Sequence, residues 1–166
     1  NIRVESCKGK HQLRTGAGNL RLEHVSGEVQ GRTSAGSVDI RHCKANITAK
    51  SATGALEARH CEGLLSLSTS GGTIELHHIQ GKVNVESSAG SIEAYDVDGA
   101  LYAHTAAGTI ELKGIKGGVN ASTPLGTIEA EILLPSDYLY LETLAGSIEV
   151  RMPFDKGMNL EVSGMS

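Results

Sequence analysis

The stretch TSGGTIEL at residues 69–76 returns as SSAGSIEA at residues 87–94 and as TAAGTIEL at residues 105–112. Each copy begins 18 residues after the previous one, with its last glycine in the same place. That glycine recurs at 18-residue intervals from Gly18 to Gly126, and a further copy, Gly146, follows after 20 residues. Such a period indicates a repeat protein whose units pack against their neighbours, because one unit cannot bury its own apolar face.

Each repeat contains two stretches in which apolar and polar residues alternate. With the recurrent glycine as position 1, positions 3 and 5 are aliphatic or small, as in Ile92 and Ala94. Positions 12 and 14 follow the same rule, and position 16 is Ser or Thr in every repeat. Alternation with a period of two is typical of strands with one buried face. Eighteen residues therefore provide two short strands and two turns, with no room for a helix.

These patterns predict an all-β fold, a single-stranded β-solenoid (β-helix) of about nine 18-residue coils over residues 1–151. Residues 152–166 change character, because Pro153 and Phe154 replace the usual turn. Proline removes a ladder donor, so we interpret residues 152–166 as a C-terminal cap of the same domain. His11 stands at an otherwise aliphatic position, which predicts a looser first coil. We expect a further segment before Asn1, where no comparable cap is present.

The composition fits a narrow core of small aliphatic side chains. Apolar residues make up 39% of the 166 residues, whereas aromatic residues make up only 3%. The 21 glycines predict many tight corners, and we expect the position-1 glycines to adopt positive φ there. A formal charge of −4 argues against a nucleic-acid partner. No apolar run approaches the ~20 residues of a membrane span.

The units TSAGSVDI, TSGGTIEL, SSAGSIEA, TAAGTIEL and TLAGSIEV are similar to those of a bacterial adhesin-like family of β-solenoid repeat domains. The resemblance covers nearly the whole chain and includes the late turns at Leu134-Pro135 and Met152-Pro153. It implies a bacterial cell-envelope or exported protein, located in the periplasm or outside the cell. The family has no defined function or catalytic residues, so the resemblance transfers no site to this chain.

An acidic column occupies position 4, and a largely basic column occupies position 6. The acidic column consists of Asp39, Glu57, Glu75, Glu93, Glu111, Glu129 and Glu149. The basic column beside it consists of Arg41, Arg59, His77, Lys113 and Arg151. We interpret the two columns as a solvated face of ion pairs between coils. The alternative is a stripe that binds cations or polysaccharide. Tyr95 and Tyr102 are the only aromatic candidates for sugar stacking in the middle of the rod.

A histidine column occupies position 7, at the first turn of each coil. It comprises His24, His42, His60 and His78, and Asp96 continues it. Imidazole is a good ligand for zinc, copper or nickel, so this column is the candidate metal site. The alternative, which we favour, is a structural stack of rings, because parallel rings rarely converge on one ion. Protonation of one ring should then disfavour protonation of the next.

Cysteines stand at position 8 in three coils, as Cys7, Cys43 and Cys61. Cys43 and Cys61 fall on adjacent coils, at a separation that a disulfide could bridge. Other coils have aliphatic residues at this position, so we predict two buried free thiols instead. A Cys–His catalytic pair is disfavoured, because adjacent residues of an extended chain point in opposite directions.

The sequence favours a non-enzymatic bacterial cell-envelope or surface module that interacts with an unknown protein or glycan partner, or acts as a spacer. We predict no cofactor and no membrane span in this chain. The alternative is a polymer-forming scaffold resembling the bactofilins, with solenoids that self-associate end to end. A carbohydrate-active β-helix enzyme is the third hypothesis. It is disfavoured by the absence of an aromatic cleft and of long loops in the sequence.

Overall fold

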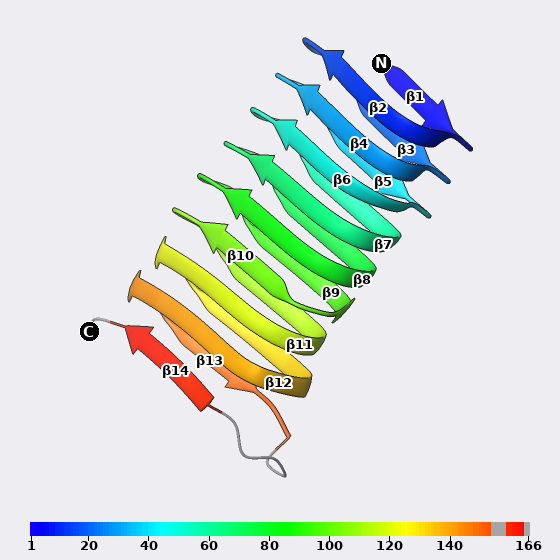
Figure 1. Cartoon of the computed structure of the whole chain (residues 1–166). Coiled ribbons are helices and arrows are strands. Elements are labelled where there is room, and N and C mark those ends of the chain that lie inside the picture. Colours follow the sequence, from blue (N-terminus) through cyan, green and yellow to red (C-terminus); the bar gives the residue numbers. More distant parts are fainter. Residues whose placement is uncertain (154–158, 165–166) are drawn as a thin grey trace.

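The computed structural model describes residues 1–153 and 159–164, and these form a β-solenoid whose coils stack along one axis (Figure 1). No helix occurs in these residues. The first coil and the last strand lie at opposite ends of the stack (Figure 1). The all-β solenoid predicted from the repeat is therefore confirmed.

Each coil contributes one strand segment to each of two faces. The first face contains β1 (Ile2–Glu5), β3 (Leu20–Glu23), β5 (Val38–Arg41), β9 (Ile92–Asp98) and β13 (Ile148–Arg151). The second face contains β2 (Lys8–Thr15), β4 (Ser26–Thr33), β6 (Lys44–Ser51), β10 (Leu101–Thr105) and β14 (Asn159–Gly164). Four longer strands bend between the faces and contribute to both: β7 (Leu56–Thr69), β8 (Ile74–Ser87), β11 (Ile110–Leu125) and β12 (Ile128–Ala145).

All pairings are parallel and join equivalent positions of successive repeats. On the first face the ladder begins at Ile2 opposite Leu20 and continues in 18-residue steps to Ile128, which pairs with Ile148 after 20 residues. This ladder has nine levels and eight steps, or about eight turns. The pairing between β11 and β12 is irregular from Leu112 to Val119, and the two additional residues of the last repeat make the step 20 residues from Val119 onward.

The core is a single column of aliphatic side chains between the two faces. Ile92 and Ile110 at position 3 have no exposed surface, as the alternation predicted. In the first coil, Ile2, Val4 and Leu13 are only partly buried against this core. Full burial of the core therefore begins at the second level, where Leu20 has no exposed surface.

The segment predicted as a C-terminal cap contains one further strand. β14 pairs in parallel with β12, with Leu160 opposite Leu139, and so extends the second face by one level. Phe154 and the rest of residues 154–158 lie outside the described residues. The capping role of residues 152–166 stays a prediction.

The expectation of positive φ at the position-1 glycines is wrong for Gly18 and for the next four, Gly36, Gly54, Gly72 and Gly90. The last four of these residues are glycine for a steric reason. A Cβ on Gly72 would overlap the carbonyl oxygen of Gly54, one level earlier, and the other three face the same obstacle. The expectation is confirmed at the last three position-1 glycines, Gly108, Gly126 and Gly146, with φ of 148–159°. Positive φ also occurs at position 10, as at Gly27 with φ of 111°.

Buried hydroxyl groups at position 16 join these glycines into a chain along the axis. The Thr33 hydroxyl donates to the carbonyl of Gly18 at 2.9 Å and accepts from the amide of Gly36 at 3.1 Å. Ser51 makes the same two bonds with Gly36 and Gly54. Because donor and acceptor are both satisfied, these hydroxyls can be buried without an unpaired polar group.

Gly71 and Gly72 provide a matched test of the close contact between levels. A Cβ on Gly71 would meet no atom within 4 Å, whereas one on Gly72 would strike backbone. We expect Gly72→Ala to lower the free energy of unfolding by about 2–3 kcal/mol, as overpacking of rigid groups does. Gly71→Ala should change it by less than about 1 kcal/mol. Urea denaturation measures both, and equal effects would contradict the steric role of Gly72.

Candidate functional site

The histidine column lies at a corner where the backbone turns left-handed. His24, His42, His60 and His78 have φ of 51–55°, and Asp96 has φ of 55°. The equivalent residues at the ends of the column are Ser6, with φ of 50°, and Gly114, with φ of 71°. Histidine and aspartate are among the few non-glycine residues enriched in this conformation. The left-handed backbone therefore favours histidine and aspartate at this corner. The 18-residue spacing alone did not reveal this preference.

The four imidazoles stack on one another along the axis. Ring centroids are 5.2 Å apart between His24 and His42, 5.1 Å between His42 and His60, and 4.7 Å between His60 and His78. The first two pairs are nearly parallel, at 8° and 10°. The predicted ring stack is therefore present. It borders a surface groove of about 560 Å³, whose other lining residues include Lys44, Glu62, Gln80, Asp98 and Lys116.

Charged groups gather at the end of the column. The Nε2 atom of His78 lies 3.7 Å from Oδ2 of Asp96, and Nζ of Lys116 lies 3.6 Å from Oδ1 of the same carboxylate. Within the stack, desolvation lowers the pKa of His60, and the charges of His78 and His42 lower it further. His60 therefore interacts with the rings on either side of it.

The geometry favours a ring stack over a metal site. Stacked rings place equivalent nitrogens on successive levels, whereas a tetrahedral zinc ion needs several nitrogens at about 2.0–2.1 Å from one point. No group of three or more His, Cys, Asp or Glu among the described residues is placed to hold a metal ion. Metal binding by His24, His42, His60 and His78 stays a prediction, and it would require the rings to turn out of the stack.

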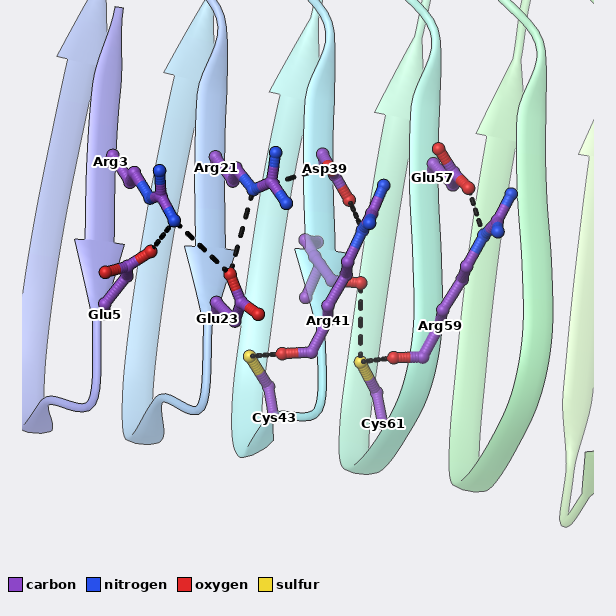
Figure 2. Close-up of polar contacts among 11 residues, drawn as sticks. Arg3, Glu5, Arg21, Glu23, Asp39, Arg41, Cys43, Glu57, Arg59 and Cys61 are labelled. Atoms are coloured by element: carbon purple, nitrogen blue, oxygen red, sulfur yellow. Dashed lines mark hydrogen bonds and ion pairs between the residues drawn. The ribbon is translucent and has the colours of Figure 1, made fainter.

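The outward side of the first face is covered by ion pairs (Figure 2). Nε of Arg41 lies 2.7 Å from Oδ1 of Asp39, and Arg59 pairs with Glu57 in the same way. These partners are two residues apart on one strand, so most pairs lie within a coil. Among the described residues of this face, the expected pairs between coils occur only at the first levels, where Arg3 lies 3.9 Å from Glu23 and Arg21 lies 3.8 Å from Asp39. The reason is that residues i and i+2 of a strand project from the same side.

Cys43 and Cys61 lie in the core, and all three cysteines are free. The Sγ of Cys43 donates to the carbonyl of Arg41 at 3.2 Å, and that of Cys61 donates to the carbonyl of Arg59 at 3.3 Å (Figure 2). The neighbouring Cys43 thiol, together with burial, raises the pKa of Cys61 above its usual value. Such a thiol is a poor nucleophile. This arrangement favours a packing role over the Cys–His pair.

The tyrosines are divided between the two faces. Tyr95, on the first face, stacks on His77 with a centroid distance of 5.0 Å. Tyr102, on the second face, receives a hydrogen bond from the hydroxyl of Tyr138 at 3.1 Å. This bond raises the pKa of Tyr138 to about 12. The contact with Tyr138 could not be found from the repeat, because two extra residues precede Tyr138 and shift its register.

No family model, curated protein or solved structure matches this chain. Among the described residues there is no helix able to cross a membrane. The resemblance to the adhesin-like family is therefore a hypothesis that rests on the repeat motif alone.

The His60 side chain should titrate below the ~6.5 of a free histidine. We expect His42→Asn with His78→Asn to raise the His60 pKa toward that value, because both neighbouring charges are removed. Asparagine also tolerates the left-handed corner. NMR titration measures the shift. The unfolded chain binds more protons near this pH, so folding stability should fall as the pH drops from ~6.5 through the folded pKa of His60. An unchanged His60 pKa would show that the rings do not interact.

The cysteines should react with a thiol reagent at two rates. Cys43 is fully buried and Cys61 is 5% exposed, whereas Cys7 is partly exposed and serves as an internal control. In the native protein we expect one fast and two slow thiols, and three fast thiols after unfolding. Reductant should leave the unfolding midpoint unchanged. Two unreactive cysteines that appear only after reduction would mean that Cys43 and Cys61 form a disulfide.

Proposed function

We propose that this chain is a non-enzymatic β-solenoid of the bacterial cell envelope or surface that acts as an interaction or spacer module. The observation that carries the proposal is the repetition of outward columns at a fixed step. Successive levels of a parallel ladder are ~4.8 Å apart, so each column presents similar side chains at that spacing. A repetitive surface suits an extended or repetitive partner better than a single small substrate.

The candidate chemical groups also support a binding role. The carboxylates at position 4 are mostly occupied by ion pairs with neighbours, as between Glu149 and Arg151 at 2.6 Å. Hydrolysis of a sugar by two carboxylates needs a pair that differs from its neighbours in position and pKa. The regular ladder offers no such distinguished pair among the described residues. The envelope location is inferred from the resemblance of the repeat.

A second candidate is the self-associating scaffold. β1 pairs only with β3, and β2 pairs only with β4, so each has one edge that accepts no strand from the described residues. An open parallel edge can accept a strand from a preceding segment or from another copy. Pairing with a strand from another copy would give the end-to-end polymer.

A glycan array combined with light scattering tests these alternatives. We expect the chain to retain at least one class of extended glycan without shortening it, and to keep a constant mass as its concentration rises. A mass that increases with concentration would favour the scaffold. Release of shorter products from a bound glycan, measured by mass spectrometry, would overturn the non-enzymatic proposal.

A further inference from the structure

The outward side of the second face differs in chemistry from the ion-paired first face. Position 13 is uncharged and polar on eight successive levels, and we call this column the polar ladder. It begins at Gln12 and Gln30 and includes Thr48, Ser66 and Asn84 in register. It then continues through Tyr102 and Asn120 to Tyr140. Amides and hydroxyls in a line can donate and accept hydrogen bonds along the whole axis.

Three cations stand beside the start of the polar ladder, two residues further along each strand. They are Arg14, Arg32 and Lys50, here called the basic stripe. Arg14 pairs in register with Arg32, and Arg32 with Lys50, so the cations occupy successive levels. All three are exposed. Within the described part of the chain, no carboxylate forms an ion pair with any of them.

The arginines of the first face, by contrast, are paired. There Arg3, Arg21, Arg41 and Arg59 each have a carboxylate partner (Figure 2). Like charges one level apart repel unless counter-charges lie close by. The basic stripe lacks such counter-charges among the described residues, in a chain whose formal charge is −4. An anion from outside the chain would supply them.

The basic stripe also borders a hollow in the surface. A groove of about 540 Å³ is lined by its three cations together with Ser34, Ser68 and Ser70. No carboxylate occurs among the described residues that line it. Cations and hydroxyl groups thus surround one concave surface, which is the donor set that a carboxylate or sulfate group requires.

We propose that the basic stripe and the polar ladder together bind a linear acidic polysaccharide, with the sugar chain running along the solenoid axis. The inference rests on the proposed interaction role, since it names the ligand. Carboxylate or sulfate groups of the polymer pair with Arg14, Arg32 and Lys50. Sugar hydroxyls further along the polymer bond with the amides and hydroxyls of the polar ladder. Many weak contacts on one rigid support add up to useful affinity.

The geometry disfavours two other linear polyanions. Side chains on one side of an extended acidic peptide repeat every ~6.6 Å, which does not match the ~4.8 Å step between levels. Single-stranded nucleic acid binds through aromatic side chains on which bases stack. The described residues that line the groove include no aromatic side chain. Tyr102 lies in the later part of the polar ladder and is linked to Tyr138, and an aromatic ring there can contact the apolar face of a sugar.

Calorimetric titration with polygalacturonate tests the inference in the intact chain. The test variant combines Arg14→Gln, Arg32→Gln and Lys50→Gln. The control combines Arg41→Gln, Arg59→Gln and Lys113→Gln, three cations of the first face that have carboxylate partners. Both variants lose three positive charges, so their net charges are equal. We expect the test variant to bind about tenfold more weakly at low salt and the control to stay within about twofold of the unmodified chain.

Salt and competing polymers provide the remaining readouts. Affinity should fall with salt more steeply for the unmodified chain than for the test variant, because fewer charges are screened in the variant. Equal weakening in both variants would overturn the inference, since net charge alone would explain it. Tighter binding of oligothymidylate or polyglutamate than of polygalacturonate would also overturn it. Circular dichroism verifies that each variant folds. If the triple variant does not fold, Arg32→Gln alone replaces it, with an expected loss of affinity between those of the unmodified chain and the triple variant.

Two outcomes separate this inference from the proposed function. Binding of neutral dextran without any binding of polygalacturonate would overturn the acidic ligand and leave the interaction role in place. Shortening of polygalacturonate by the chain would overturn the non-enzymatic role itself, even if the basic stripe holds the polymer.

Discussion

The contact between glycines on successive levels is the constraint on which the rest of this structure depends. The carbonyl oxygen of Gly54 occupies the space that a Cβ on Gly72 would need, and the same relation recurs at the neighbouring levels. The hydroxyl of Thr69 bonds to both glycines, at 3.2 Å each, and fixes one level above the other. Because the corner is closed by backbone and a short hydroxyl, the core beside it can be narrow and aliphatic. This explains the high glycine and low aromatic content.

A fixed step at the corners places every outward side chain in a column. The columns have different causes. At position 7 the left-handed backbone favours residues such as His60 and Asp96, so the ring stack follows from the corner as well as from repetition. At positions 4 and 6 the even spacing along a strand brings opposite charges together, as in Asp39 and Arg41. A column of reactive or charged residues therefore indicates a binding site only where backbone conformation and ion pairing do not already account for it.

The basic stripe is the column that neither backbone conformation nor ion pairing explains in the described part of the chain. The residues of the histidine column occupy a left-handed corner that favours them, and the arginines of the first face have partners. Arg14, Arg32 and Lys50 have neither explanation in the described part of the chain, and they border a groove with hydroxyl groups. The two faces thus differ in the groups that they offer to a partner. One face is neutralised internally, and the other leaves hydrogen-bonding groups and positive charge available to a partner.

The sequence by itself determined the period, the two strands per coil, the inward residues such as Ile92 and the stacking of the histidine rings. These follow from spacing, because an 18-residue repeat in parallel register must superpose equivalent positions. Only the tertiary structure decided why Gly72 is glycine, why His60 tolerates its corner and which carboxylate each arginine meets. It also placed Tyr138 against Tyr102 and left the basic stripe unpaired beside a groove. Such contacts depend on φ angles, side-chain reach and local register shifts, none of which is encoded in the repeat period.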